Sequence, residues 1–484
     1  MKIYNTLSRK KEELVEKKIG MYVCGPTVYD EPHIGHARSA YIFDVIVRYL
    51  RYLKGKGKVK FVRNVTDIDD KIIDRARGTP GAEDLKTKVK KISEKYLKKY
   101  HEDMDSFGLL KPDIEPRATE TIKDMIKFIE ALIKKDYAYE TGQGVYFDVR
   151  KFKDYGKLSG QGLDQMEEGA RVSLDKNKKD PLDFALWKKS KEDEPSWKSP
   201  WGEGRPGWHI ECSVMSTKFL GKDFLIHGGG LDLIFPHHEN EIAQTVCAGK
   251  RSAKYWIHNG LLTTAGQKMS KSLGNFITIG DFITRYKDTD LLKLLFLSSH
   301  YRHPVDYTEE KIKEAARMKE RITLFLDNTK KSEIRLVPSA VEGNPKSETS
   351  PKSDLSRAKS REIRKIKEEF TAAMDDDFNT PKALSSIFEL VRSGNTYLAQ
   401  NDLKSARAVR RLIKELCKVL GLDLEKIVAI EPEIKGRIEK LIKERDSARQ
   451  NKDFKKADKI RSELLEEGVV LEDTKESTIW RRKI

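Results

Sequence analysis

Ile19-Gly-Met-Tyr-Val-Cys-Gly-Pro26 is a short apolar run ended by Gly-Pro, and Val59-Lys-Phe-Val62 is a second apolar run. Between them, residues 38–53 carry apolar side chains at helical spacing, and Gly55 follows as a helix-ending residue. A strand, a helix and a strand in this order predict a βαβ unit, whose strands are parallel and whose crossover is right-handed. The stretch therefore predicts an α/β fold built on a parallel sheet.

Composition bounds the class of protein. The chain has 484 residues, enough for several domains with a sizeable core. It is 35% charged and 38% hydrophobic, and apolar runs such as 291–297 are far too short to span a membrane, so we expect no membrane partner. The formal net charge of +17 favours a polyanionic partner.

Cysteine usage and the N-terminus indicate the compartment. The chain begins Met-Lys-Ile-Tyr-Asn without an apolar leader, and nearby glutamates disfavour a transit peptide. Its four cysteines, at 24, 212, 247 and 417, do not form a disulfide framework and indicate a reducing environment. We therefore expect a cytoplasmic protein whose cysteines serve a metal or the core.

The stretch 197–241 concentrates residues that bind metals. His237 and Glu241 are four positions apart after Pro236, so a helix beginning there would place both side chains on one face, and Cys212 lies in the same stretch. Imidazole, carboxylate and thiolate together suit zinc. The alternative, a polar loop followed by a helix with a solvated acidic face, stays open on these residues alone.

Two short motifs suggest a phosphate site. His33-Ile-Gly-His36 directly precedes the predicted helix, where unpaired N–H groups and the helix dipole favour anions. Lys268-Met-Ser-Lys-Ser272 is a basic segment much later in the chain. Each motif alone is a weak signal, and a solvated loop is the alternative for the second one.

Together and in this order, the two motifs resemble the signatures of class I aminoacyl-tRNA synthetases. The closer resemblance is to the cysteinyl-tRNA synthetase family, and it extends over nearly the whole chain. The further matching segments are Met21-Tyr-Val-Cys-Gly-Pro-Thr-Val-Tyr-Asp30, Asn64-Val-Thr-Asp-Ile-Asp-Asp-Lys-Ile-Ile73, 197–213, His227-Gly-Gly-Gly230, Phe235-Pro-His-His-Glu-Asn-Glu-Ile-Ala-Gln244, Asp375-Asp-Asp-Phe-Asn-Thr-Pro381, Leu471-Glu-Asp-Thr474 and Trp480-Arg481.

The resemblance implies a zinc site that selects the substrate. Its ligands would be Cys24, Cys212, His237 and Glu241, and the walls of the amino-acid pocket would include Gly25, Thr27, Thr66 and Trp208. An apolar pocket separates isosteres only about 100-fold. Because zinc binds thiolate well and an alcohol poorly, coordination of the substrate sulfur would reject serine.

The resemblance also implies the reaction and the partners. His33, Gly35 and His36 would contact the phosphates of ATP, and Lys271, with Lys268 nearby, would neutralise the leaving pyrophosphate. Mg²⁺ would enter with ATP. The expected partners are ATP, L-cysteine and tRNA(Cys), and we expect a monomer.

The same resemblance implies the domain organisation. We expect a Rossmann-like catalytic domain with an inserted connective domain, followed by a C-terminal helical-bundle region that binds the anticodon. The predicted segments are the first catalytic half (1–104), the insertion (105–200), the second catalytic half (201–290), a helical stem-contact region (291–334), a flexible linker (335–360), the helical bundle (361–430) and a C-terminal tRNA-binding extension (431–484).

Other functional classes fit the sequence less well. Gly202-Glu-Gly-Arg-Pro-Gly207 has the spacing of a dinucleotide-binding loop but does not follow an apolar strand, which disfavours an oxidoreductase. His227-Gly-Gly-Gly230 is similar to an esterase loop, but no G-x-S-x-G occurs. Paralogues that pass cysteine to an amino sugar lack a region like 360–484, and a non-catalytic zinc protein would leave both motifs unexplained.

Overall fold

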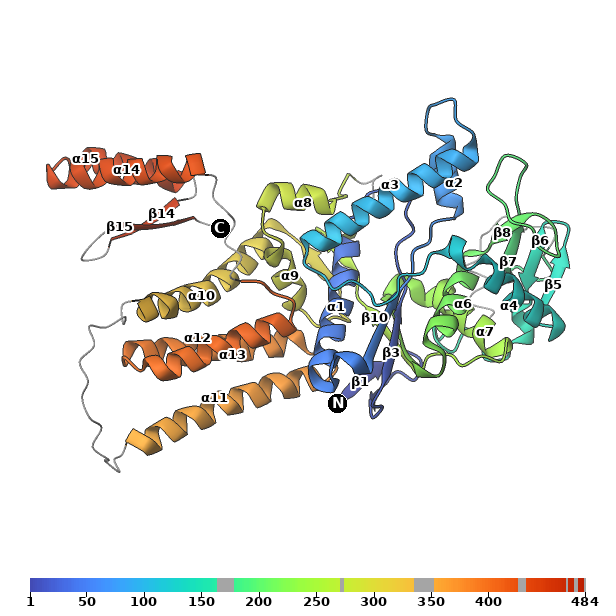
Figure 1. The fold of residues 1–484 in the computed structure, drawn as a ribbon, viewed down its shortest axis with the longest axis horizontal. Helices are drawn as coiled ribbons and strands as arrows, with labels where there is room; N and C mark the ends of the chain where they lie inside the picture. The colour runs from blue at the N-terminus through green and yellow to red at the C-terminus, as the bar shows by residue number, and fades with distance from the viewer. Residues whose placement is uncertain are drawn as a thin grey trace.

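A computed structural model describes residues 1–162, 178–269, 274–334, 352–424, 432–466, 469–473 and 478–482 (Figure 1). Its centre is a four-stranded parallel sheet with the strand order β10-β9-β3-β4. The strands are β3 (Ile19–Val23), β4 (Val59–Arg63), β9 (Phe224–Gly230) and β10 (Tyr255–Asn259). The predicted α/β class and the βαβ unit are confirmed.

The crossover helix α1 (Ile34–Lys54) begins earlier than the apolar periodicity indicates, because a histidine caps it. The imidazole of His33 accepts a hydrogen bond from the Gly35 N–H at 3.0 Å, and His36 Nδ1 accepts one from the His33 N–H at 3.2 Å. The motif His33-Ile-Gly-His36 is thus the first turn of α1, and its start faces the carboxyl ends of the strands.

The sheet reverses its strand order between β3 and β9. The chain passes from β3 to β4 on one side and later adds β9 and β10 on the other. In open parallel sheets, ligands bind beyond the carboxyl ends of the strands at such a switch point. Cys24 follows β3 there, and the three glycines at 228–230 end β9.

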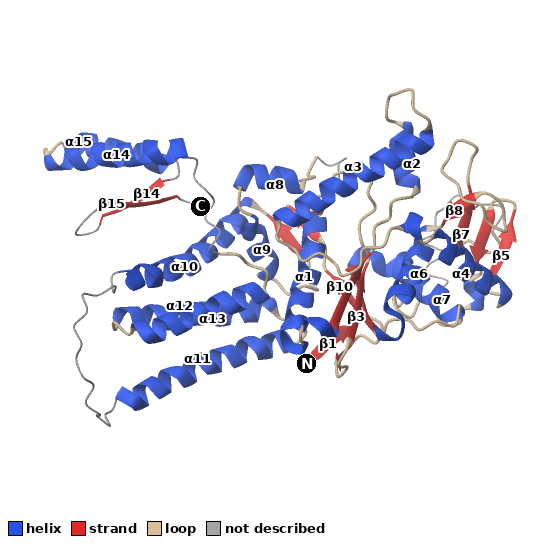
Figure 2. Ribbon diagram, viewed as in Figure 1, coloured by secondary structure: helices blue, strands red, loops and turns tan. Residues whose placement is uncertain are grey.

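A second, antiparallel sheet lies apart from the first (Figure 2). It comprises β5 (Ala138–Thr141), β6 (Gly144–Phe147), β7 (Phe184–Lys189) and β8 (Gly204–Pro206). Its last strand lies beyond residue 200, the predicted end of the insertion. The helices around the two sheets are α2 (Asp70–Arg77), α3 (Leu85–Ser106), α4 (Ile122–Lys134), α6 (Trp208–Leu220) and α7 (Glu239–Cys247).

Further short strands and three helices complete the first 334 residues. The strands are β1 (Lys2–Asn5), β2 (Lys10–Glu13), β11 (Leu262–Thr264), β12 (Gln267–Lys268) and β13 (Val305–Tyr307). The helices are α8 (Ile279–Tyr286), α9 (Thr289–Leu297) and α10 (Glu309–Ile334).

The bundle contains α11 (Lys352–Asp375), α12 (Thr380–Ala399) and α13 (Leu403–Val419). Helix α11 begins inside the predicted linker 335–360, and residues 335–351 of that segment lie outside the described residues. The bundle shares one apolar core with α1, α9 and α10. Tyr41 on α1 also donates a hydrogen bond to the Leu420 carbonyl at 2.6 Å, so the bundle is anchored directly on the crossover helix.

The C-terminal unit has a small core of its own, formed by Ile438, Ile442, Ile460, Leu464, Val469 and Leu471. It consists of α14 (Pro432–Gln450), α15 (Phe454–Glu466) and a hairpin of β14 (Val469–Asp473) and β15 (Thr478–Arg482). The sequence analysis predicts an extension at 431–484 but does not predict the hairpin. Across the residues described, no helix is long and apolar enough to cross a membrane.

Candidate functional site

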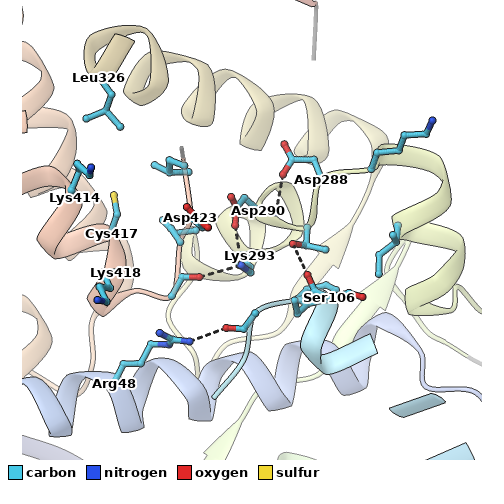
Figure 3. Close-up of a pocket in the computed structure, with 18 residues that line it drawn as sticks. Arg48, Ser106, Asp288, Asp290, Lys293, Leu326, Lys414, Cys417, Lys418 and Asp423 are labelled. Carbon is cyan, nitrogen blue, oxygen red and sulfur yellow. Dashed lines mark hydrogen bonds and ion pairs between the residues drawn. The ribbon is translucent and has the colours of Figure 1, made fainter. Parts of the chain in front are cut away.

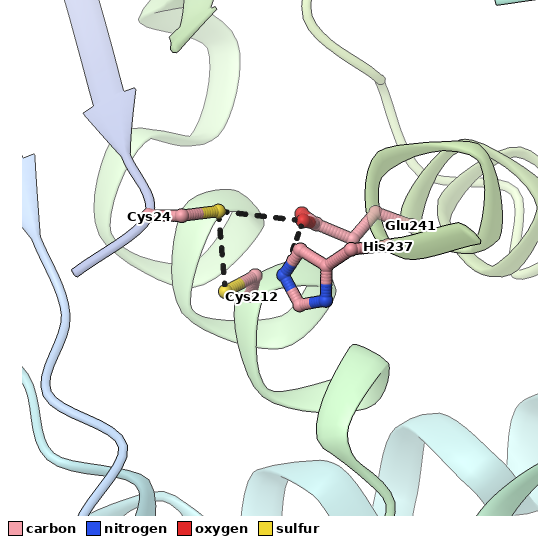
Figure 4. A group of neighbouring side chains, drawn as sticks. All are labelled: Cys24, Cys212, His237 and Glu241. Atoms are coloured by element: carbon pink, nitrogen blue, oxygen red, sulfur yellow. Dashed lines mark hydrogen bonds and ion pairs between the residues drawn. The ribbon is translucent and has the colours of Figure 1, made fainter. Parts of the chain in front are cut away.

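Four potential metal ligands from three distant segments meet at the switch point (Figure 4). The sulfur atoms of Cys24 and Cys212 lie 3.7 Å apart, and the Cys24 sulfur lies 3.6 Å from Glu241 Oε1. His237 Nε2 lies 3.1 Å from the same oxygen. The potential ligand atoms of the four residues lie within 4.8 Å of one another. The structure therefore brings together all four residues that the sequence analysis names as ligands.

The orientation of His237 is set by a neighbouring imidazole. Its Nδ1 lies 2.9 Å from His209 Nδ1, so its Nε2 is the nitrogen that faces Glu241. Trp208 covers the His237 ring, with the two ring centroids 4.3 Å apart. Hydrogen bonds to the second nitrogen of this kind select the tautomer of a metal-binding histidine.

Two further histidines form a second donor set, which the sequence analysis missed. His227 Nε2 and His238 Nε2 lie 3.4 Å and 3.3 Å from the Cys24 sulfur, and with Glu241 these residues form a group that could also hold a metal. His238 Nδ1 lies 2.7 Å from His258 Nε2. Both histidines occur in the segments quoted for the resemblance, but nothing in those segments indicates that their side chains reach Cys24.

Glycines at the end of β9 allow His238 to pack close to the strand. A Cβ atom at position 229 would lie 2.7 Å from Cε1 of His238, and one at 228 would lie 2.3 Å from the Phe43 ring. Gly228 thus leaves room for α1 on one side of the site, and Gly229 leaves room for a histidine on the other. A side chain at 229 would displace His238 from the cluster.

The electrostatics of the cluster favour a divalent cation. Burial raises the pKa of the Glu241 carboxyl and the pKa of the Cys24 thiol well above their usual values. Burial also acts to raise the pKa of Cys212, but hydrogen bonds with Cys24 and His237 bring it to about 7. Burial lowers the pKa of His227 and His238, so these imidazoles are neutral. A bound cation would offset the cost of the buried anions, so the donor set fits a metal.

A cavity of about 310 Å³ extends from this cluster to the start of α1. Its lining includes Cys24, Gly25, Thr27, His33, Gly35, His36, Trp208 and Met269. Thr66, named in the sequence analysis as a pocket wall, is only 3% exposed and donates a hydrogen bond to Glu211 at 2.7 Å. It lies behind the wall of the cavity.

The two signature motifs meet at this cavity. The rings of His33 and His36 stack with their centroids 3.8 Å apart. A Cβ atom at position 35 would lie 3.2 Å from the terminal methyl carbon of Met269, so the second motif packs over the glycine of the first. Lys268 is the last residue of β12, opposite Thr263. Lys271 lies outside the described residues.

The cavity also has walls that sequence reasoning did not name, among them Arg63, Lys71, Asn259 and Gly260. Lys71 lies within a segment quoted for the resemblance and Arg63 directly precedes that segment, which were the available signals. Cys247 and Cys417 are buried and belong to neither donor set, as expected for core residues.

A larger cavity, of about 740 Å³, lies where α1, α9 and α13 meet (Figure 3). Its buried charges are already paired. Lys293 Nζ lies 2.9 Å from Asp290 Oδ1, and Lys319 Nζ lies 2.7 Å from Asp288 Oδ2. These buried ions are neutralised by one another. The smaller cavity is lined by His33, His36 and the potential metal ligand Cys24, so it is the better candidate for the chemistry.

The fold and the two motifs define the catalytic domain of a class I aminoacyl-tRNA synthetase. A family model described as "tRNA synthetases class I (C) catalytic domain" matches residues 10–317. Models for a DALR domain and for a cysteinyl-tRNA ligase anticodon binding domain match 369–425 and 431–481. The solved structure of Mycobacterium tuberculosis methionyl-tRNA synthetase in complex with methionyl-adenylate has a similar fold. Its TM-score is 0.59 at 14% identity, covering 84% of this chain and 90% of that chain.

The chain belongs to the cysteine–tRNA ligase family. It is 50% identical over 512 residues to the cysteine–tRNA ligase of Thermodesulfovibrio yellowstonii, with 100% of both chains covered. It is 48% identical over 492 residues to the cysteine–tRNA ligase of Thermococcus gammatolerans, with 100% of this chain and 99% of the relative covered. The resemblance on which the sequence analysis relied is thus confirmed.

Proposed function

We propose that this chain activates L-cysteine with ATP and transfers it to the 3′ end of tRNA(Cys). In the first step a carboxylate oxygen of cysteine forms a bond to the α-phosphorus of ATP, and pyrophosphate leaves with the electron pair of the broken P–O bond. In the second step a terminal ribose hydroxyl of the tRNA attacks the adenylate, and AMP leaves. A single observation carries the proposal: Cys24, a member of the metal-type cluster, and the His33–His36 pair line one cavity.

Selection of cysteine is assigned to Cys24, Cys212, His237 and Glu241, which would hold one zinc ion. When bound, zinc supplies a Lewis acid that prefers a thiolate sulfur to a hydroxyl oxygen. Cys24 lies at the cavity wall, whereas Cys212 and Glu241 are buried beneath it. A substrate sulfur would therefore approach from the side of Cys24 and Trp208. We place Gly25 and Thr27 in the wall beside it.

Activation is assigned to the first turn of α1 and to the second motif. A carboxylate is ionised at neutral pH, so the reaction needs no protein base, and catalysis consists of positioning and charge stabilisation. His33 and His36 present rings and N–H groups at a helix N-terminus, where phosphate binds readily. Lys271 and Lys268 would neutralise the pyrophosphate, and Mg²⁺ would enter with ATP.

Recognition of tRNA(Cys) is assigned to the bundle and to the C-terminal unit. The chain has a formal net charge of +17, and phosphate contacts dominate the affinity of proteins for nucleic acid. As an enzyme of translation it would act in the cytoplasm, and we expect it to act as a monomer.

Two assays on one preparation test the proposal. ATP–pyrophosphate exchange should depend on cysteine and should be negligible with serine, because serine lacks the sulfur ligand. Charging of a tRNA(Cys) transcript should follow, whereas an amino-sugar acceptor should not be modified. Exchange without tRNA charging would contradict the second half of the proposal. Exchange with serine that equals exchange with cysteine would contradict the selection mechanism.

A further inference from the structure

Arg63 is a buried cation at the wall of the active-site cavity. It is the last residue of β4, only 4% of it is exposed, and it lines the cavity beside Cys24 and Gly25. Its guanidinium has two long hydrogen bonds, at 3.4 Å to the Tyr100 hydroxyl and 3.5 Å to the Ala40 carbonyl. Its Cζ also lies 5.1 Å from the centroid of the Phe61 ring.

No carboxylate lies within ion-pair distance of Arg63 among the residues that the structure describes. The other buried arginines have charged partners or more hydrogen bonds. Arg205 pairs with Asp70 and Glu194, and Arg445 pairs with Asp473 at 2.8 Å. Arg38 has no carboxylate partner but donates hydrogen bonds to three backbone carbonyls, those of Leu261, Tyr301 and His303. Burying a guanidinium without an anion is costly, and its five N–H groups require more partners than two long bonds supply. The missing partner is therefore a ligand anion, and the cavity is where it can enter.

The position of Arg63 indicates which anion that is. A Cβ atom at position 25 would lie 3.2 Å from Cγ of Arg63, so the side chain runs past the segment that follows Cys24. The His33–His36 pair, assigned to the ATP phosphates, lies at the start of α1, whereas Arg63 contacts Ala40, deeper in the same helix. Arg63 thus belongs to the amino-acid end of the cavity.

We propose that Arg63 binds the α-carboxylate of the cysteine substrate and positions it for attack on ATP. The proposal rests on the proposed function and deepens it, because it supplies the carboxylate partner that the zinc ligands and the two motifs lack. A guanidinium matches a carboxylate as a planar fork and holds both oxygens in one plane. One lone pair of one oxygen remains free to form the bond to the α-phosphorus.

The test compares cysteine with cysteamine, which has the same thiol and amine but no carboxylate. The full-length, zinc-loaded chain is used as wild type, Arg63→Met and Arg63→Lys. The matched control is Arg51→Met, since Arg51 pairs with Asp113 at 2.6 Å and does not line the cavity. The readouts are KM for cysteine and for ATP in pyrophosphate exchange, and inhibition by cysteamine.

Arg63→Met should raise KM for cysteine roughly 10- to 100-fold, as expected for loss of a hydrogen-bonded charged partner. KM for ATP and inhibition by cysteamine should stay near the wild-type values. Arg63→Lys should have a KM for cysteine between those of the wild type and Arg63→Met, because lysine keeps the positive charge but cannot donate two parallel hydrogen bonds to the carboxylate. If Arg63→Met does not fold, the same comparison of KM for cysteine with inhibition by cysteamine is made with Arg63→Lys alone.

If Arg63→Met weakened inhibition by cysteamine as much as it raised KM for cysteine, the proposal would be overturned and Arg63 would have a merely structural role. A raised KM for ATP with an unchanged KM for cysteine would assign Arg63 to the phosphates and would also overturn it. Failure of the proposed function is a separate result, since the wild-type chain itself would then show no cysteine-dependent exchange.

Discussion

Replacing Cys212 with serine tests the metal assignment where the two donor sets differ. Cys212 belongs only to the set with His237, whereas Cys24 and Glu241 belong to both sets. Serine removes the thiolate and changes little else in size. Zinc binds an alcohol poorly, so the variant keeps three ligands.

The expected loss follows from the number of ligands. Structural zinc sites contribute about 10–16 kcal/mol in total, so an equal share for each of four ligands is about 2.5–4 kcal/mol. At about 1.4 kcal/mol per factor of ten, the zinc Kd of Cys212→Ser should rise about 10²- to 10³-fold. In this assignment His238 is not a ligand but lies against the ligand Cys24. His238→Gln should therefore raise the zinc Kd only about 10-fold.

The assay is competition for zinc with a chromogenic chelator at pH 7. Cys417→Ser is the matched control, because Cys417 is also a buried cysteine (4% exposed) but lies on α13, outside both donor sets. It should bind zinc like the wild type. If His238→Gln lost zinc more strongly than Cys212→Ser, the metal would belong to the second set with His227. Equal losses in Cys212→Ser and Cys417→Ser would indicate general destabilisation and refute the ligand assignment.

Three further outcomes are expected. Lys271→Ala should reduce cysteine-dependent pyrophosphate exchange by orders of magnitude at nearly unchanged thermal stability, and near-normal exchange would remove its assigned role. Removing 431–484, which has a core of its own, should spare exchange and severely impair tRNA charging, whereas undiminished charging would mean that this unit has another function. Burial lowers the pKa of His258 to about 3, so the unfolded chain binds a proton that the folded chain excludes, and stability falls as pH drops from about 6.5 towards 3. Between pH 7 and 5 the free energy of unfolding, measured by denaturant unfolding, should fall by about 2 kcal/mol more in the wild type than in His258→Gln. An equal fall in both proteins would contradict the lowered pKa of His258.

The choice of 431 as the cutting point is a consequence of packing. The sequence suggests a break near 360, where a serine- and proline-rich segment ends. In the structure, the bundle that follows shares its core with α1 and is tied to the catalytic part at Asp377, which is fully buried. This carboxylate accepts hydrogen bonds from the Tyr301 hydroxyl and from Arg302 Nε, each at 2.8 Å. A cut at 360 would expose that core, so it would test stability and not function.

Local sequence patterns predict the first part of the architecture. The apolar runs at 19–24 and 59–62 and the periodicity of 38–53 are properties of neighbouring residues, so they predicted the parallel βαβ unit correctly. The sequence analysis did not predict that α1 begins before residue 38, because histidine is an unusual capping residue. The hairpin of β14 and β15 was not predicted, because its strands are short and are stabilised by pairing with each other and by packing on α14 and α15, which local sequence does not show.

By itself, the sequence determined the family, the first βαβ unit and the four potential ligands with the two signature motifs, because these are carried by residue identity and short-range spacing. Only the tertiary structure decided that His227 and His238 also reach Cys24, that Thr66 lies behind the cavity wall, and that Arg63 is buried at the cavity without an anion. These features depend on side-chain direction and on the approach of segments nearly two hundred residues apart, such as Cys24 and Cys212. A short motif predicts its own local backbone structure, but the packing of the whole chain determines which residues its side chains contact.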